Sequence, residues 1–131
     1  MIRGASAGYK FNLAYKFSDL KNVKILFWQD GNDGPSNDRP LPIIKVLQQC
    51  TQGDTEYQLY VTLNQEETLR FSDKRKAKAQ LRALTSTGIP FSSKERLITV
   101  YPVYDDSILG DEVLPTPSHD GWIYLDGEYV T

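Results

Sequence analysis

Two adjacent glutamates, Glu66 and Glu67, are the first residues in this sequence whose types suggest chemistry. A carboxylate pair can perform general acid–base catalysis when one pKa is raised and both groups lie in a cleft. Here the pair follows Asn64, which can cap a helix, and Glu67 lies at the position of the reciprocal partner in a capping box. Glu66 adds negative charge near the positive end of that helix. The pattern therefore predicts a structural helical turn and not a catalytic pair.

The other candidates for chemistry are equally weak. His119, the only histidine, stands beside Asp120 without a second histidine or a cysteine nearby, so neither a zinc site nor a Ser-His-Asp triad is expected. Cys50 is the only cysteine, which excludes an internal disulfide. The segment "DGNDG" lacks the length and the closing glutamate of a calcium loop. We expect no catalytic residue, no metal, no cofactor and no enzyme activity.

A basic run, "SDKRKAK", occupies residues 72–78. Proteins that bind nucleic acid usually add stacking aromatic residues or a broader basic face. The simpler interpretation is a loop that leads into a strand edge, where lysines discourage edge-to-edge pairing. We therefore expect no nucleic-acid partner. No run is apolar enough for a signal peptide or long enough for a membrane helix, so no membrane partner is expected either.

The charge is divided unevenly along the 131 residues. The net charge is −2, but all 15 Lys and Arg lie in residues 1–103, together with ten of the 17 acids. Residues 104–131 hold the remaining seven acids and no Lys or Arg. This tail is either a solvated end or a segment that lies along a basic surface, its own or that of a neighbour.

The body of the chain reads as short strands. Period-two alternation of apolar and polar residues predicts strands at 9–16, 56–63 and 77–84, and apolar content predicts a central strand covered on both faces at 23–29. Further strands are expected at 43–49 and 96–104, and a long loop at 30–42. Short strands spaced about ten residues apart and separated by turn signals indicate an all-β, antiparallel sandwich.

The end of the tail, "WIYLDGEYVT", carries the strongest short hairpin signal in the chain. Asp126-Gly127 suits a two-residue turn between "IYL" and "EYV". An isolated hairpin is marginal in water, so its aromatic residues need another surface, either the body or another chain. We expect a β-sandwich domain at 1–104 and an acidic C-terminal arm with a terminal hairpin at 105–131.

Five segments carry a family resemblance: "MIRG", "LNQEETLRF", "KAQLRALTSTGIPFSSK", "ITVYPV" and "GWIYLDGEY". They resemble small virion proteins of tailed bacteriophages, which open similarly, have a "T-Q-E-E-T-L-x-F" turn and often end in an "LDGG"-like segment. The chain is also similar to the immunoglobulin-like N-terminal domain of phage baseplate upper proteins. It differs in its long 30–42 loop and in Glu128, where a second glycine might be expected.

The resemblance implies a structural protein of a phage particle: a head decoration, a fibre anchor, or a collar or tail component. It implies synthesis in the host cytoplasm, location in the virion, and other virion proteins as partners in a multi-copy assembly or homo-oligomer. Adding a strand to a neighbour's sheet would bury the backbone and aromatic residues of the tail together. The expected contact residues are Trp122, Ile123, Tyr124, Tyr129, Gly31, Asn32 and Arg39.

Two other functions remain open. The first is a carbohydrate-binding or host-recognition module, in which exposed Trp28, Trp122 and Tyr residues would stack on sugar rings. The second is an inhibitor of a host enzyme with an acidic, DNA-like surface. The second ranks last, because the acids lie in the tail and not across a folded face.

Overall fold

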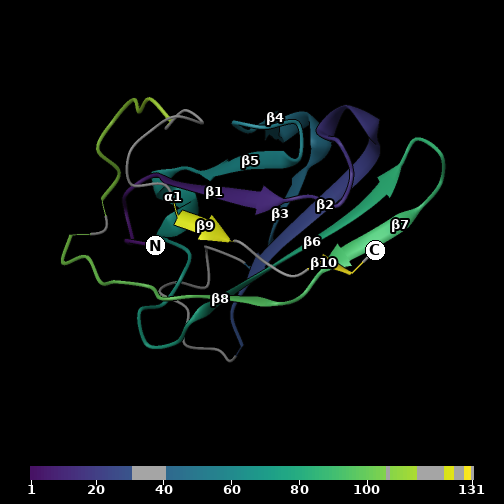
Figure 1. The fold of residues 1–131 in the computed structure, drawn as a ribbon. Coiled ribbons are helices and arrows are strands. Elements are labelled where there is room, and N and C mark those ends of the chain that lie inside the picture. The colour runs from purple at the N-terminus through teal and green to yellow at the C-terminus, as the bar shows by residue number, and fades with distance from the viewer. Residues whose placement is uncertain (31–40, 106, 115–122, 126–128, 131) are drawn as a thin grey trace.

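The computed structural model describes residues 1–30, 41–105, 107–114, 123–125 and 129–130, and for the last two segments it describes the backbone. The protein is all-β, with mostly antiparallel sheets and little helix (Figure 1). The first sheet has the order β4-β5-β1-β9 and the second has the order β10-β7-β6-β2-β3, with β8 also paired to β6. The strands of the first sheet are β1 (Ala7–Asn12), β4 (Thr51–Gln52), β5 (Gln58–Leu63) and β9 (Ile123–Leu125). Those of the second are β2 (Leu20–Trp28), β3 (Ile43–Val46), β6 (Ala77–Thr85), β7 (Pro90–Ser93), β8 (Arg96–Ile98) and β10 (Tyr129–Val130).

One apolar core lies between the two sheets. Alternate residues of β1 and β5 face it from one side, and alternate residues of β2 and β6 face it from the other. The rings of Tyr9 on β1 and Phe27 on β2 meet across the core with centroids 5.4 Å apart. The predicted alternation of β6 is confirmed, because Ala77, Ala79, Leu81 and Ala83 are all buried.

The prediction that the 23–29 strand is covered on both faces is wrong in part. Strand β2 is interior to its sheet, between β6 and β3. Its inner face is buried, but on its outer face Lys24 is exposed and Leu26 and Trp28 are only half-buried. High apolar content here reflects one buried face and one partly open face.

The predicted terminal hairpin is not formed. Strand β9 pairs in parallel with β1, with Tyr9 opposite Ile123, whereas β10 pairs antiparallel with β7 in the other sheet, with Ser93 opposite Tyr129. Pairing with an edge of an existing sheet adds each strand to an established core, whereas an isolated hairpin is marginal. The pairing of β9 and β10 therefore follows the open edges of β1 and β7; the turn signal at Asp126-Gly127 lies outside the described residues.

Strand β7 was missed by the sequence patterns, and the strand expected at 96–104 is shorter than predicted. Strands β7 and β8 follow one another along the same edge of β6, with a shift of one residue in register between them. At the shift, the Leu81 amide donates to Ser93 Oγ (2.9 Å), so a side chain replaces a backbone acceptor. Since β6 is paired on both sides, the basic run does not lead into a strand edge as expected.

The described residues also contain three short helices: 3-10 turns at Phe17–Asp19 and Leu47–Gln49, and α1 at Gln65–Thr68. All three fall far short of the length needed to cross a membrane.

Candidate protein–protein interface

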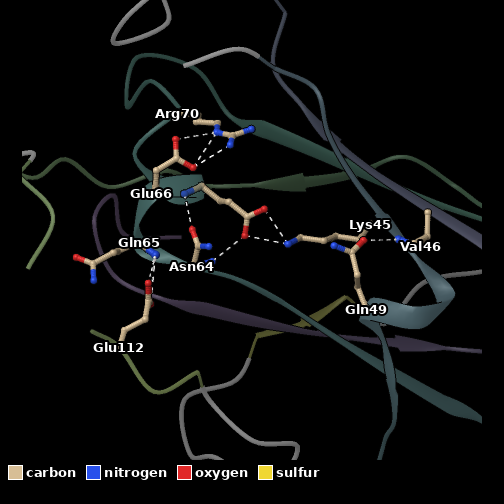
Figure 2. A network of polar contacts seen from close by, with 9 residues as sticks. Lys45, Val46, Gln49, Asn64, Gln65, Glu66, Arg70 and Glu112 are labelled. Atoms are coloured by element: carbon tan, nitrogen blue, oxygen red, sulfur yellow. Dashed lines mark hydrogen bonds and ion pairs between the residues drawn. The ribbon is translucent and has the colours of Figure 1, made fainter. Parts of the chain in front are cut away.

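Helix α1 begins with the predicted capping box (Figure 2). The Glu67 amide donates to Asn64 Oδ1 (2.8 Å), and the Asn64 amide donates to Glu67 Oε1 (3.0 Å). Lys45 Nζ on β3 lies 2.7 Å from Glu67 Oε2, and Arg70 forms a two-nitrogen contact with Glu66 (Nη2 to Oε2, 2.8 Å). Hydrogen bonding to Glu66 raises the pKa of the Arg70 guanidinium. Each glutamate therefore has a cationic partner of its own, which supports the structural interpretation of the pair.

Gln65, at the start of α1, holds the arm against the body. Its amide donates to both carboxylate oxygens of Glu112 (3.1 and 3.3 Å), as Figure 2 shows. Its side-chain amide donates to the Gly110 carbonyl (3.2 Å) and accepts from the Leu109 amide (2.8 Å). Gln65 is buried, whereas its partners in the arm are exposed, so these contacts are partly buried. Gln65 thus contacts three residues of the arm, Leu109, Gly110 and Glu112.

The N-terminal residues hold the chain just before the arm. Met1 and Arg3 bracket Tyr101: the Tyr101 amide donates to the Met1 carbonyl (2.8 Å), and the Arg3 amide donates to the Tyr101 carbonyl (3.1 Å). The terminal ammonium donates to the Thr99 carbonyl (2.9 Å), and its burial lowers its pKa. Residues 99–101 are therefore fixed to the body before the arm turns toward α1.

Between and beyond these anchors, the arm presents large apolar side chains to solvent. Tyr104 and Val113 are almost fully exposed, at 101% and 94%, and Leu109 is 79% exposed. We call the exposed apolar residues of this segment the arm strip: Tyr104, Ile108, Leu109, Val113 and Leu114. Apolar side chains gathered on one segment whose backbone is held in place are typical of a surface that meets another protein.

The predicted contact residues are only partly placed. Ile123 and Tyr124 lie on β9, with their backbones opposite Tyr9 and Lys10 of β1, and Tyr129 lies on β10 opposite Ser93. Trp122, Gly31, Asn32 and Arg39 lie outside the described residues. The arm strip and Gln65 were missed by sequence reasoning. The one sequence signal for the arm strip was the run of apolar residues between the acids at 104–114.

Lys10 is a second feature that the sequence did not reveal. Alternation correctly placed it on the outer face of β1, yet it is only 3% exposed. Its Nζ lies 3.1 Å from Asp54 Oδ2 and 4.8 Å from the centroid of the Tyr60 ring. Hydrogen bonds from Tyr60 and Lys10 lower the pKa of the Asp54 carboxyl. Only the β1–β5 register, which the sequence does not give, brings Lys10 opposite Tyr60.

The remaining candidates for chemistry are placed as follows. Cys50 is buried, its thiol donates to the Val46 carbonyl (3.3 Å), and burial raises its pKa to about 12. Within the part of the chain that the structure describes, no three His, Cys, Asp or Glu side chains group as metal ligands would. His119 lies outside that part. In the basic run, Lys74, Arg75 and Lys76 are exposed, and Lys78 pairs with Asp30 and lies 3.6 Å from Glu95.

Comparison with known proteins returns no match: no family model, no curated protein and no solved structure is similar to this chain.

Proposed function

We propose that this protein is a non-catalytic structural subunit of a bacteriophage virion. It attaches to or decorates the particle, as a head decoration, a fibre anchor, or a collar or tail component. Its partners are other virion proteins in a multi-copy assembly, formed after synthesis in the host cytoplasm. The body is proposed to be an immunoglobulin-like sandwich, which the two sheets around one core support.

The observation that carries the assembly role is the arm strip. Five large apolar side chains are exposed on a segment whose backbone is anchored by Gln65 and Glu112. Because the segment is already ordered on the body, a partner that covers these side chains does not have to order the backbone first. Burial of the strip would supply about 25 cal/mol per Å² of apolar surface. This suits a stable contact between subunits.

The test uses particles purified from a phage that carries this sequence. Mass spectrometry is expected to detect the protein in purified particles at a fixed ratio to the major coat protein. Complementation with L109S/V113S is expected to lower that ratio several-fold. The control is L97S, which removes an exposed apolar residue (56%) from β8, outside the arm. Particles that lack the protein altogether would refute a virion role, and equal incorporation of both variants would refute the role of the arm strip.

A carbohydrate-binding role is the alternative. The half-buried Trp28, at the end of β2, is the described residue that supports it. The exposed Tyr57 and Tyr104 lie on separate segments, before β5 and at the start of the arm, so they add less to one sugar-binding surface. If glycan binding is observed and W28A abolishes it while L109S/V113S does not, this alternative replaces the assembly role.

A further inference from the structure

A basic pair stands on the outer face of the six-stranded sheet. Lys24 on β2 and Arg82 on β6 are directly opposite one another, and both are exposed. Among the described residues, neither forms an ion pair with an acid. Like charges directly opposite across two strands destabilise a sheet. A feature that opposes folding in this way indicates a functional reason for keeping it.

The pair lies in a hollow of about 320 Å³ that crosses β2, β6 and β7. The outer-face residues of the hollow are Asn22, Lys24, Arg82, Leu84, Pro90 and Ser92; the residues between them, such as Val23 and Phe91, are buried toward the core. The lining is therefore mixed: Lys24 and Arg82 lie in one row across the strands, and the apolar Leu84 and Pro90 lie in the next row. Such a surface fits a peptide that carries both carboxylates and apolar side chains.

This chain contains such a peptide in its own arm. Residues 105–114 hold four acids, no Lys or Arg, and most of the arm strip. Residues 107–114 do not lie over the hollow of their own molecule, because Gln65 anchors residues 109–112 at α1. Figure 1 places residues 107–114 at the left of the molecule and the β6–β7 turn, beside the hollow, at the right. The two complementary surfaces therefore lie at opposite sides of one molecule.

We propose that residues 104–114 of one copy dock in the Lys24–Arg82 hollow of a second copy, through Asp105, Asp111 and the arm strip. The contact is heterologous, so repetition produces a ring or an open filament. This inference deepens the proposed function by naming the surface that receives the arm, and it rests on the arm being a contact segment.

The first test is the mass of the full chain by light scattering and sedimentation over a concentration series at low salt. The wild-type mass is expected to rise with concentration and to fall when salt is added. K24E/R82E is expected to weaken association by at least about tenfold, which corresponds to about 1.4 kcal/mol. The matched control K74E/K76E makes the same charge change at exposed residues outside the hollow and is expected to leave association unchanged.

The second test separates docking from a structural role of the basic pair. D105K/D111K is expected to weaken association as K24E/R82E does, and the chain with all four substitutions is expected to regain it. Glu112 is left intact because it binds the Gln65 amide. The single variant K24E turns the like-charged pair into an opposite-charged pair, so its melting temperature is expected to rise while its association weakens. A merely structural pair would not separate stability from association in this way.

A wild-type chain that stays monomeric at every concentration would overturn this inference. So would equal association of K24E/R82E and its control. If K24E/R82E changes only the binding of inorganic phosphate, followed by NMR, the hollow is an anion site and not a docking site for a second copy. In each case, loss of particle incorporation by L109S/V113S would still support the proposed function, because that result requires only that the arm meets some virion protein.

Discussion

The hydroxyl of Tyr9 is an unfavourable group in the core. Its ring is fully buried against Phe27, and the hydroxyl has no hydrogen-bond partner among the described residues. A buried polar group without a partner costs about 1–3 kcal/mol. Y9F is therefore expected to raise the free energy of unfolding by about 1 kcal/mol in urea denaturation. The control Y57F removes a solvated hydroxyl and is expected to change nothing; a less stable Y9F would reveal a partner.

The same hydroxyl predicts a dependence of stability on alkaline pH. Burial raises the pKa of Tyr9 above its ordinary value of 10.0. The folded state therefore holds this proton more tightly than the unfolded state. The free energy of unfolding is consequently unaffected by this group below pH 10.0 and falls as the pH rises above it. In denaturation experiments above pH 10.0, Y9F is expected to lose less stability than the wild type. Parallel losses in the two proteins would contradict this account.

The Lys45–Glu67 ion pair differs from the Glu66–Arg70 pair in burial. The side chains of Lys45 and Glu67 are 11% and 13% exposed, whereas those of Arg70 and Glu66 are 26% and 39% exposed. E67Q retains the capping geometry but leaves Lys45 without its counter-charge, so we expect a loss of about 2–3 kcal/mol. E66Q is expected to cost no more than about 0.5 kcal/mol. Equal losses, measured in urea, would show that burial does not separate the pairs.

At the scale of the elements, helix α1 acts as the holder of the arm, through Gln65. Q65A removes the two contacts that its side chain makes with Leu109 and Gly110. We expect the arm to be cleaved several-fold faster by chymotrypsin, at Tyr104 and Leu109, with little change in global stability. Q48A, which changes an exposed glutamine in the 3-10 turn after β3, is the control. Unchanged cleavage would mean that other contacts hold the arm.

The elements that sequence could predict are those whose signal is local. The capping box at Asn64–Glu67 and the alternation of β6 depend on neighbouring residues alone, and both are confirmed. Strand β7 was missed because "PFSS" is too short and too polar to alternate clearly, and its pairing with β6 is not visible in a local pattern. The hairpin at Asp126-Gly127 was wrong because local turn chemistry competed with two open sheet edges. The hollow and the anchor at Gln65 depend on contacts between distant segments, which no local pattern contains.

At the scale of the whole molecule, β9 and β10 complete both sheets. Removal of residues 115–131 would leave β1 and β7 as open edges. The truncated chain is expected to melt at lower temperature and to aggregate, because exposed strand edges pair with other chains. Thermal unfolding with light scattering measures both effects. A truncated protein as stable as the full chain would show that the two strands contribute little to the fold.

The parallel pairing of β1 with β9 also sets an order of events during synthesis. The two strands are more than 100 residues apart in the chain, so β1 leaves the ribosome long before its partner is made. Until then one side of β1 stays unpaired, and nascent chains on the same messenger could join there. Lys10, in the middle of β1, places a positive charge beside this unpaired edge. The residue that becomes one of the most buried cations of the finished protein would thus keep neighbouring unfinished chains apart.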